Sequence, residues 1–299
     1  MPYGKPALSY AQQVAQLVAR GMSVAEPVAA EAFLSKTSYY RLSAYWFPFR
    51  VRGTAGAVLD VFEPGTAFDQ VVQLYEFDRE LRLLVLDALE RIEVSVRTAV
   101  THQLGMAHGA FGHEMAGNFH PQFNHAEWVA KLRAETKRST DAFVEHFQSC
   151  YSDYPAMPIW MCTEVVSIGA LSLLYKGMQN SDKAAVAATF GVHPKRLQDW
   201  LHVLSYVRNV CAHHSRLWNR ELAIKPRAMP EPEWNTPLLP SNSRLFCVLL
   251  MLTVLLNRSG GSLAWRGQCT GLLRRLATSP RWRAAMGLPP NWEEHPLWK

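Results

Sequence analysis

One short stretch of the chain combines residue types that can catalyse reactions at phosphorus. SYVRNVCAHHSRLWNR contains Arg208, Asn209 and His213. A histidine, with an ordinary pKa of about 6.5, can take the proton of a ribose 2′-hydroxyl or protonate the leaving oxygen. An arginine can neutralise charge that gathers on the phosphate, and an asparagine can orient the imidazole or hold a phosphate oxygen. The set therefore suits metal-free cleavage of RNA that leaves a 2′,3′-cyclic phosphate.

The spacing sets a condition on this site. Asn209 and His213 are four residues apart and share a helix face, whereas Arg208 lies about 140° from His213 around the helix. Arg208 is long enough to curl toward the imidazole, and a second copy across a two-fold axis would place two motifs in one cleft. We therefore expect a homodimer. The competing interpretation is that these residues are helix caps and ion-pair partners, because Arg followed five residues later by His is common by chance.

Further basic residues could bind an RNA backbone. Arg216 and Arg220 lie one and two turns beyond the motif and would extend a positive track. Arg41 stands near Tyr45 and Trp46, a combination that suits base stacking, although core packing is the more common role of such aromatics. The full set of predicted RNA-binding residues is His214, Arg216, Arg220, Arg41 and Arg79.

Charged residues near the expected long helices are weaker candidates. Arg79 belongs to YEFDRELR, whose charges could face the catalytic helix but normally form a solvated face or local pairs. Glu164 could reach Arg208 or Arg216 across a bundle, but a surface or capping carboxylate is the more common case. These residues have no pattern that decides between the two roles.

No metal or cofactor is expected. The middle of the chain has histidines at irregular spacing, which no cysteine joins in a zinc pattern: His102, His108, His113, His120 and His125. Cys211 lies between the motif residues, but its place on an apolar stripe indicates burial rather than a nucleophile.

The composition bounds the class of protein. The chain has 299 residues, 48% of them hydrophobic, and a net charge of +6 that mildly favours polyanionic partners. Five separated cysteines in apolar runs indicate reduced thiols, and the first residues lack the pattern of a signal peptide. The longest apolar run, 245–256, is short of the roughly 20 residues that span a bilayer. We expect a cytoplasmic protein without a membrane segment.

Apolar periodicity predicts an all-α fold. Helices are expected at about 9–20, 26–35, 38–45, 71–105, 159–177, 182–190, 194–211 and 244–258. Residues 105–125 read as a long functional loop, and the tail from Pro280 is expected to dock in extended form because its tryptophans are costly to expose. The predicted parts are an N-terminal helical extension (1–63), a helical bundle (64–258) and a C-terminal helix with a Pro/Trp-rich tail (259–299).

The whole run VRNVCAHHSRLWNR resembles the signature of the Abi-like (AbiD/AbiF) abortive-infection family of bacterial phage-defence proteins, a branch of the HEPN superfamily. The resemblance covers most of the chain. Other stretches that carry it are KPALSYAQQ with ARGM, SYYRLSAYWFPFR, YEFDRELR, EVVSIGALSLLY and MGLPPNWEEHPLW.

This resemblance implies a fold and an activity. HEPN domains are four-helix bundles that usually dimerise, and many are metal-independent endoribonucleases with an Arg-x4–6-His motif, here Arg208 and His213. A polar residue after the arginine, here Asn209, is typical of the active branch. Some systems of this family pair with a small RNA that restrains the toxin, so a regulatory RNA is an expected partner beside the RNA substrate.

Two other functions stay open from the sequence. A non-catalytic module could use the same basic face to hold a small structured RNA or an antitoxin partner. DNA binding through the three short N-terminal helices rests only on their lengths, because VAEPVAAEAFL is acidic to neutral and lacks a basic recognition helix.

Overall fold

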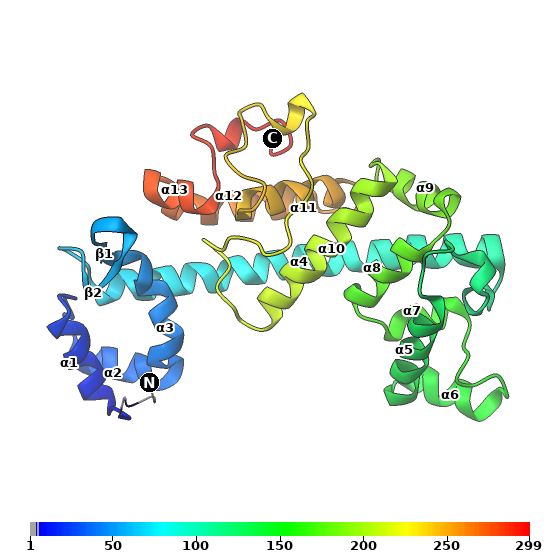
Figure 1. The fold of residues 1–299 in the computed structure, drawn as a ribbon, viewed down its shortest axis with the longest axis horizontal. Helices are drawn as coiled ribbons and strands as arrows, with labels where there is room; N and C mark the ends of the chain where they lie inside the picture. The colour runs from blue at the N-terminus through cyan, green and yellow to red at the C-terminus, as the bar shows by residue number, and fades with distance from the viewer. Residues whose placement is uncertain (1–3, 5) are drawn as a thin grey trace. The chain divides into compact units, whose positions relative to one another are not determined.

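A computed structural model describes residues 4 and 6–299 (Figure 1). Helices form in almost every segment in which apolar residues recur at helical spacing. Within these described residues there are thirteen α-helices and one two-stranded sheet, which confirms the all-α fold class. The helices are α1 (Tyr10–Ala19), α2 (Pro27–Thr37), α3 (Tyr39–Trp46), α4 (Phe68–His108), α5 (His125–Arg138), α6 (Ala142–Cys150), α7 (Ile159–Val165), α8 (Ile168–Gly177), α9 (Asn180–Thr189), α10 (Pro194–Ala212), α11 (Leu245–Ser259), α12 (Ser262–Ala277) and α13 (Pro280–Met286).

The chain divides into two units, Met1–Glu80 and Leu81–Lys299, and α4 runs through the boundary. In the first unit, α1 begins with a capping box in which Ser9 and Gln12 satisfy each other's backbone N–H groups. The predicted three-part division of the chain stays a prediction.

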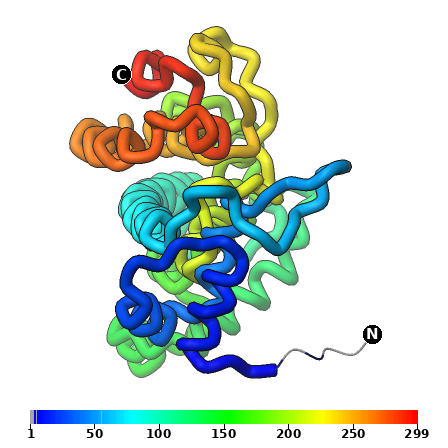
Figure 2. Tube along the Cα trace, turned by 90° about the vertical axis from the view of Figure 1, so that its left-hand side faces the viewer, coloured from blue at the N-terminus to red at the C-terminus, as the bar shows by residue number. Residues whose placement is uncertain are grey.

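A small hairpin follows α3 in the first unit, and the periodicity had not predicted it. Strands β1 (Arg50–Arg52) and β2 (Val58–Phe62) pair antiparallel, and Figure 2 shows them as a lighter blue tube beside the darker blue N-terminal helices. Asp60 on β2 accepts ion pairs from Arg20 at 2.7 Å and Arg50 at 3.0 Å. The hairpin is thereby tied to the end of α1.

The core of the second unit is built around α11. Eleven of its fifteen residues are buried, as expected of a helix that is apolar on every side. Trp265 on α12 donates its indole N–H to the Leu84 carbonyl of α4 at 2.7 Å, which fixes α12 beside α4. Helix α10 packs against α8 and α9. The second unit is therefore the helical bundle that carries the motif.

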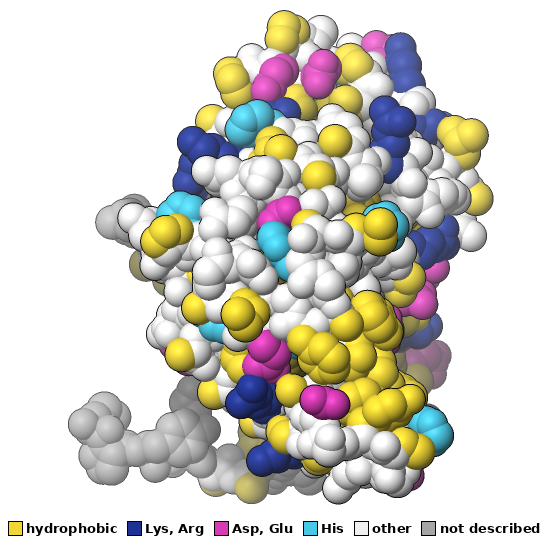
Figure 3. All heavy atoms as spheres, turned by 90° about the vertical axis from the view of Figure 1, so that its right-hand side faces the viewer, with side chains coloured by type: hydrophobic (Ala, Val, Ile, Leu, Met, Phe, Trp, Pro, Cys, Tyr) yellow, Lys and Arg dark blue, Asp and Glu magenta, His cyan; other side chains and the backbone are white. Residues whose placement is uncertain are grey.

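Helices α5 to α7 form a smaller group, in which α5 packs against α7 and α8. Figure 3 shows the end of the second unit that includes this group. Hydrophobic side chains gather in one area of this face, and Lys and Arg side chains are interspersed with Asp and Glu. Large hydrophobic residues that stay exposed in this part of the chain are Met106, Phe111, Met115, Tyr151 and Trp160.

Two expected elements differ from the structure. The predicted helix 159–177 is broken into α7 and α8, because Ser167 leaves the helical path and its hydroxyl caps the Ala170 N–H at 3.3 Å. The tail was expected to be extended, but Pro280 begins helix α13, where a proline at the first helical position costs nothing. Its docking is confirmed, since Trp292 and Trp298 are buried against Phe246.

The predicted loop 105–125 is shorter than expected. Helix α4 continues to His108, and α5 already begins at His125. Two short 3-10 helices, Gly112–Glu114 and Ala116–Asn118, lie between them. None of the helices in the described part of the chain is long and apolar enough to cross a lipid bilayer.

Candidate functional site

Helix α10 positions the Arg-Asn-His motif. Pro194 stands at its first turn, and the His193 imidazole caps the Lys195 N–H at 3.2 Å. The apolar residues of the helix are buried at Leu197, Trp200, Leu201, Val203, Leu204, Val207, Val210 and Cys211. Gly169 of α8 lies opposite Ser205, where an added Cβ would come within 3.2 Å of the Ser205 hydroxyl. This close approach holds α10 firmly against α8, so the motif stands on a rigid support.

The motif lies where α10 ends. The last helical residue is Ala212, His213 caps the helix, and His214 takes the left-handed conformation with φ of 56°. Backbone bonds of a Schellman turn close the end: His213 N–H to Asn209 C=O at 3.0 Å, His214 N–H to Cys211 C=O at 3.0 Å, and Ser215 N–H to Val210 C=O at 2.9 Å. Glycine is the usual residue at the left-handed position, so a histidine there is uncommon.

The side chains of Arg208 and Asn209 are brought together. Nη1 of Arg208 donates to Oδ1 of Asn209 at 3.4 Å, and the Arg208 residue is half-buried. The predicted approach of Arg208 to the His213 imidazole stays a prediction. His213 stands one helical turn beyond Asn209, because its N–H still bonds to the Asn209 carbonyl. Its imidazole is exposed, and no described residue gives it a hydrogen-bond or ion-pair partner. The three residues therefore form an open polar site at a helix end.

The basic track beyond the motif takes a different path from the predicted one. Because α10 ends at Ala212, Arg216 and Arg220 lie in an irregular segment rather than on further turns of the helix. Nε of Arg220 donates to the Arg216 carbonyl at 2.7 Å, and both side chains are half-buried. Leu217 and Trp218 between them are buried and anchor the segment. Arg216 and Arg220 therefore follow the motif closely in sequence, but they lie in a compact loop and not on a helix.

The remaining predicted RNA-binding arginines belong to the first unit. Arg41 is exposed on α3, whereas Tyr45 and Trp46 beside it are buried, so core packing of the two aromatics is confirmed and base stacking on them is wrong. Arg79 on α4 is exposed and pairs with Glu76 at 2.7 Å, which is the local pairing that helical spacing permits.

A charged residue beside Arg79 is not solvated. The carboxylate of Asp78 is fully buried and accepts a hydrogen bond from the Tyr45 hydroxyl at 2.7 Å. Arg82 on the same helix is also buried. The expectation of a solvated charged face is therefore wrong at these two positions.

Glu164 is exposed at the end of α7 and forms no ion pair with any described residue. Among residues 4 and 6–299, no group of three or more His, Cys, Asp or Glu side chains is placed to hold a metal ion.

The loop histidines have structural partners instead. Nε2 of His113 lies 3.5 Å from Sγ of Cys162, a contact that the sequence spacing did not reveal. Burial lowers the pKa of His113 to about 4 and raises the pKa of Cys162 to about 12. This pair is therefore neutral and unreactive at neutral pH.

A second buried cluster joins α4 to α9. The carboxylate of Asp182, which is 4% exposed, accepts hydrogen bonds from Nε2 of Gln103 at 2.8 Å and Nε2 of His108 at 2.9 Å. Local pattern could not predict it, because Asp182 lies far from both partners in the sequence. It fixes the end of α4 against the helix that precedes α10.

Sequence reasoning also missed a polar stripe on α10. Gln198, His202, Ser205 and Asn209 stand at positions i, i+4, i+7 and i+11, which fall on one face of a helix. His202 and Asn209 are exposed and the other two are half-buried. The spacing of these four residues already places them on one helix face, but the prediction used only the apolar face of the helix. The stripe leads from the start of α10 to the motif.

Comparison with known proteins decides the family. The family model described as Abi-like protein matches residues 32–219, more than half of the chain. The chain belongs to the Abi-like family. Its matched segment ends just after the motif, at Asn219, and thus includes α10 and the Schellman turn. No curated protein and no solved structure matches the chain.

Membership of this family implies a role in abortive infection, a form of phage defence. The segment that matches the family model includes all of α4 and α10. The matched part of the chain is therefore the part that builds and supports the motif.

Proposed function

We propose that this Abi-like protein is a metal-independent endoribonuclease of the HEPN type that acts as a toxin in abortive infection, with Arg208, Asn209 and His213 as its catalytic residues. The observation that carries the proposal is the contact of Arg208 with Asn209 one turn before an exposed imidazole. These groups supply a cation, an amide and a proton-transfer group at one accessible helix end.

The reaction follows from these groups. The His213 imidazole takes the proton of a 2′-hydroxyl, the 2′-oxygen forms a bond to phosphorus, and the bond from phosphorus to the 5′-oxygen breaks. A second imidazole protonates the leaving oxygen, and Arg208 neutralises the charge on the phosphate. We propose that a second copy of the chain supplies that second imidazole, because one copy has a single motif. RNA is the substrate, and a small regulatory RNA is a further proposed partner.

Cleavage by purified protein tests the proposal. Single-stranded RNA incubated with the protein and a chelator should yield fragments that end in a 2′,3′-cyclic phosphate. Arg208→Ala and His213→Ala should each slow cleavage at least about 100-fold, the usual contribution of a general base or a charge-stabilising group. Matched controls are Arg138→Ala and His146→Ala, which remove exposed side chains outside the motif. Full cleavage by a variant that lacks both Arg208 and His213 would refute the proposal.

Mixing parent chains with His213→Ala chains tests the proposed dimer. If each copy supplies one imidazole to the same reaction, a mixed dimer lacks one of the two imidazoles and should be inactive. Cleavage should then fall faster than the fraction of parent chains as the variant is added, whereas a site within one chain would lose activity only in proportion to that fraction. Protein that retains RNA in a fixed ratio but never shortens it would favour the non-catalytic RNA-binding function instead.

A further inference from the structure

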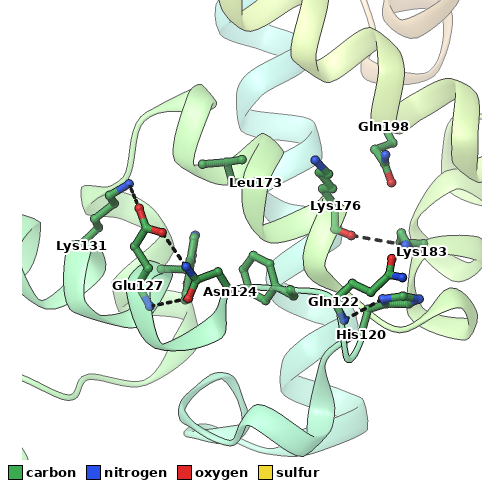
Figure 4. A pocket seen from close by; sticks show the side chains of 11 residues that line it. His120, Gln122, Asn124, Glu127, Lys131, Leu173, Lys176, Lys183 and Gln198 are labelled. Carbon is green, nitrogen blue, oxygen red and sulfur yellow. Dashed lines mark hydrogen bonds and ion pairs between the residues drawn. The ribbon is translucent and has the colours of Figure 1, made fainter.

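A pocket on the second unit lies apart from the motif residues. Its volume is about 590 Å³, within the usual size range of small-molecule sites. The walls come from the segment before α5 and from α5, α8, α9 and α10 (Figure 4). The lining residues are His120, Gln122, Phe123, Asn124, Glu127, Trp128, Lys131, Leu173, Lys176, Lys183 and Gln198.

Hydrogen bonds hold the loop that forms one wall. The His120 N–H donates to the Gly177 carbonyl at 2.8 Å, and Nε2 of Gln179 donates to the Phe119 carbonyl at 2.7 Å. The ring of Phe123 lies where a Cβ of residue 177 would stand, so only glycine there admits it. The pocket is therefore preformed by α8 and this loop, and a ligand does not have to order it.

The pocket carries an excess of positive charge. Lys131 pairs with Glu127 at 2.6 Å, which neutralises one side. Figure 4 shows Lys176 and Lys183 away from that pair, with Nζ of Lys183 donating to the Lys176 carbonyl at 3.3 Å. Within the described residues, no carboxylate forms an ion pair with either lysine. Burial also lowers the pKa of Lys183. An anionic ligand would gain a favourable interaction with these cations.

The other lining residues suit an aromatic ring with polar edges. Phe123 is half-buried and Leu173 keeps 46% of its surface exposed, so both supply apolar surface, while the buried Trp128 lies behind them. The side-chain amides of Gln122 and Gln198 have no hydrogen-bond partner among the described residues and can read the edge of a base. An apolar wall, two side-chain amides and two lysine cations together match a nucleotide.

The pocket is connected to the motif by one helix face. Gln198 lines the pocket and begins the polar stripe that ends at Asn209, eleven residues later. At 1.5 Å per residue this is a distance of about 16 Å along the helix. One strand of RNA is long enough to reach both places.

We propose that this pocket holds one nucleotide of a single-stranded RNA, with backbone phosphates near Lys176 and Lys183 and its base against Phe123 and Leu173. The inference rests on the proposed function, since it makes the pocket a substrate subsite remote from the reacting phosphate. It selects single-stranded RNA, because a paired base cannot enter.

The affinity of the protein for an RNA that cannot be cleaved tests the pocket independently of the proposed reaction. A single-stranded 2′-O-methyl RNA hexamer lacks the nucleophilic hydroxyl, and its affinity is measured by titration calorimetry. Lys176→Met with Lys183→Met keeps the side-chain stems and removes both charges. We expect this double variant to bind at least about tenfold more weakly, and the salt slope of its binding to fall by about 0.7 for each phosphate that the variant no longer neutralises. Lys137→Met, an exposed lysine of α5 outside the pocket, is the control and should bind like the parent chain.

The outcomes separate the possible ligands. Unchanged affinity of the double variant would overturn the inference. If 5′-nucleoside monophosphates bind and their binding depends on both lysines, but the hexamer does not bind, the ligand is a free nucleotide. The inference that an RNA strand supplies the nucleotide would then be wrong. Inorganic phosphate that competes as well as a nucleotide would overturn the role of the base. In the Arg208→Ala, His213→Ala background, the change of Lys176 and Lys183 to Met should weaken hexamer binding by the same factor as in the parent chain, so the pocket is read independently of the motif.

Discussion

Gly177 offers a quantitative test of the packing that shapes the pocket. An ideal Cβ on this residue would lie 2.6 Å from Cγ, Cδ1 and Cδ2 of Phe123. The ring cannot easily give way, because the Phe123 N–H donates to the His120 carbonyl at 2.8 Å and the ring packs against Phe119 with centroids 5.5 Å apart. We expect Gly177→Ala to lower the free energy of unfolding by about 1–3 kcal/mol, the usual cost of overpacking.

The sign of the effect should reverse when the ring is removed. Gly177 is the last residue of α8, and alanine is favoured over glycine in a helix by up to about 1 kcal/mol. In a Phe123→Ala background, Gly177→Ala should therefore leave the free energy of unfolding unchanged or raise it. Gly267→Ala on α12 is the matched control, because a Cβ there meets nothing within 4 Å. It should raise the free energy of unfolding by about 0.5–1 kcal/mol.

Urea denaturation followed by circular dichroism measures all five proteins, and the coupling energy between positions 123 and 177 comes from the double-mutant cycle of four of them. If Gly177→Ala stabilises the parent chain as Gly267→Ala does, the contact with the ring is not what fixes glycine at this position. Equal losses in both backgrounds would lead to the same conclusion.

Two further predictions concern the buried clusters. Burial holds the pKa of His113 near 4 rather than 6.5, so about 3 kcal/mol of unfolding free energy, present above pH 6.5, should be lost as the pH falls toward 4. Urea denaturation from pH 7 to 4.5 should show a shallower decline for His113→Leu, and an identical decline would contradict this reasoning. Asp182→Ala leaves Gln103 and His108 without their acceptor and should cost about 3 kcal/mol, whereas Asp182→Asn keeps an acceptor oxygen and should cost about 1 kcal/mol. Equal unfolding midpoints for these two variants would show that the hydrogen bonds contribute little.

The sequence predicted the elements whose signals are local. Apolar periodicity located α4 and α11, and Pro194 located the start of α10. The break before α8 was missed because apolar residues continue through it, while the decisive signal was the single capping hydroxyl of Ser167. The hairpin was missed because its strands are short and pair only with each other.

The candidate site was predictable where the chain itself holds its residues together. Arg208, Asn209 and His213 share one helix end, so their spacing already gave the geometry. The buried role of Asp78 depends on Tyr45, and the lysines of the pocket come from different helices. Such groupings arise only from tertiary packing, and no spacing in the sequence encodes them.

The turn at the end of α10 does not depend on the side chains of the proposed catalytic residues. The bonds that close it join main-chain atoms, so side chains at 208, 209 and 213 can be exchanged while the turn persists. Loss of RNA cleavage at these positions would therefore report on the proposed reaction rather than on unfolding. Position 214 differs, because its left-handed backbone favours glycine over any other residue. A substitution at 214 therefore changes the strain of the turn together with the side chain, so its effect reports on folding as well.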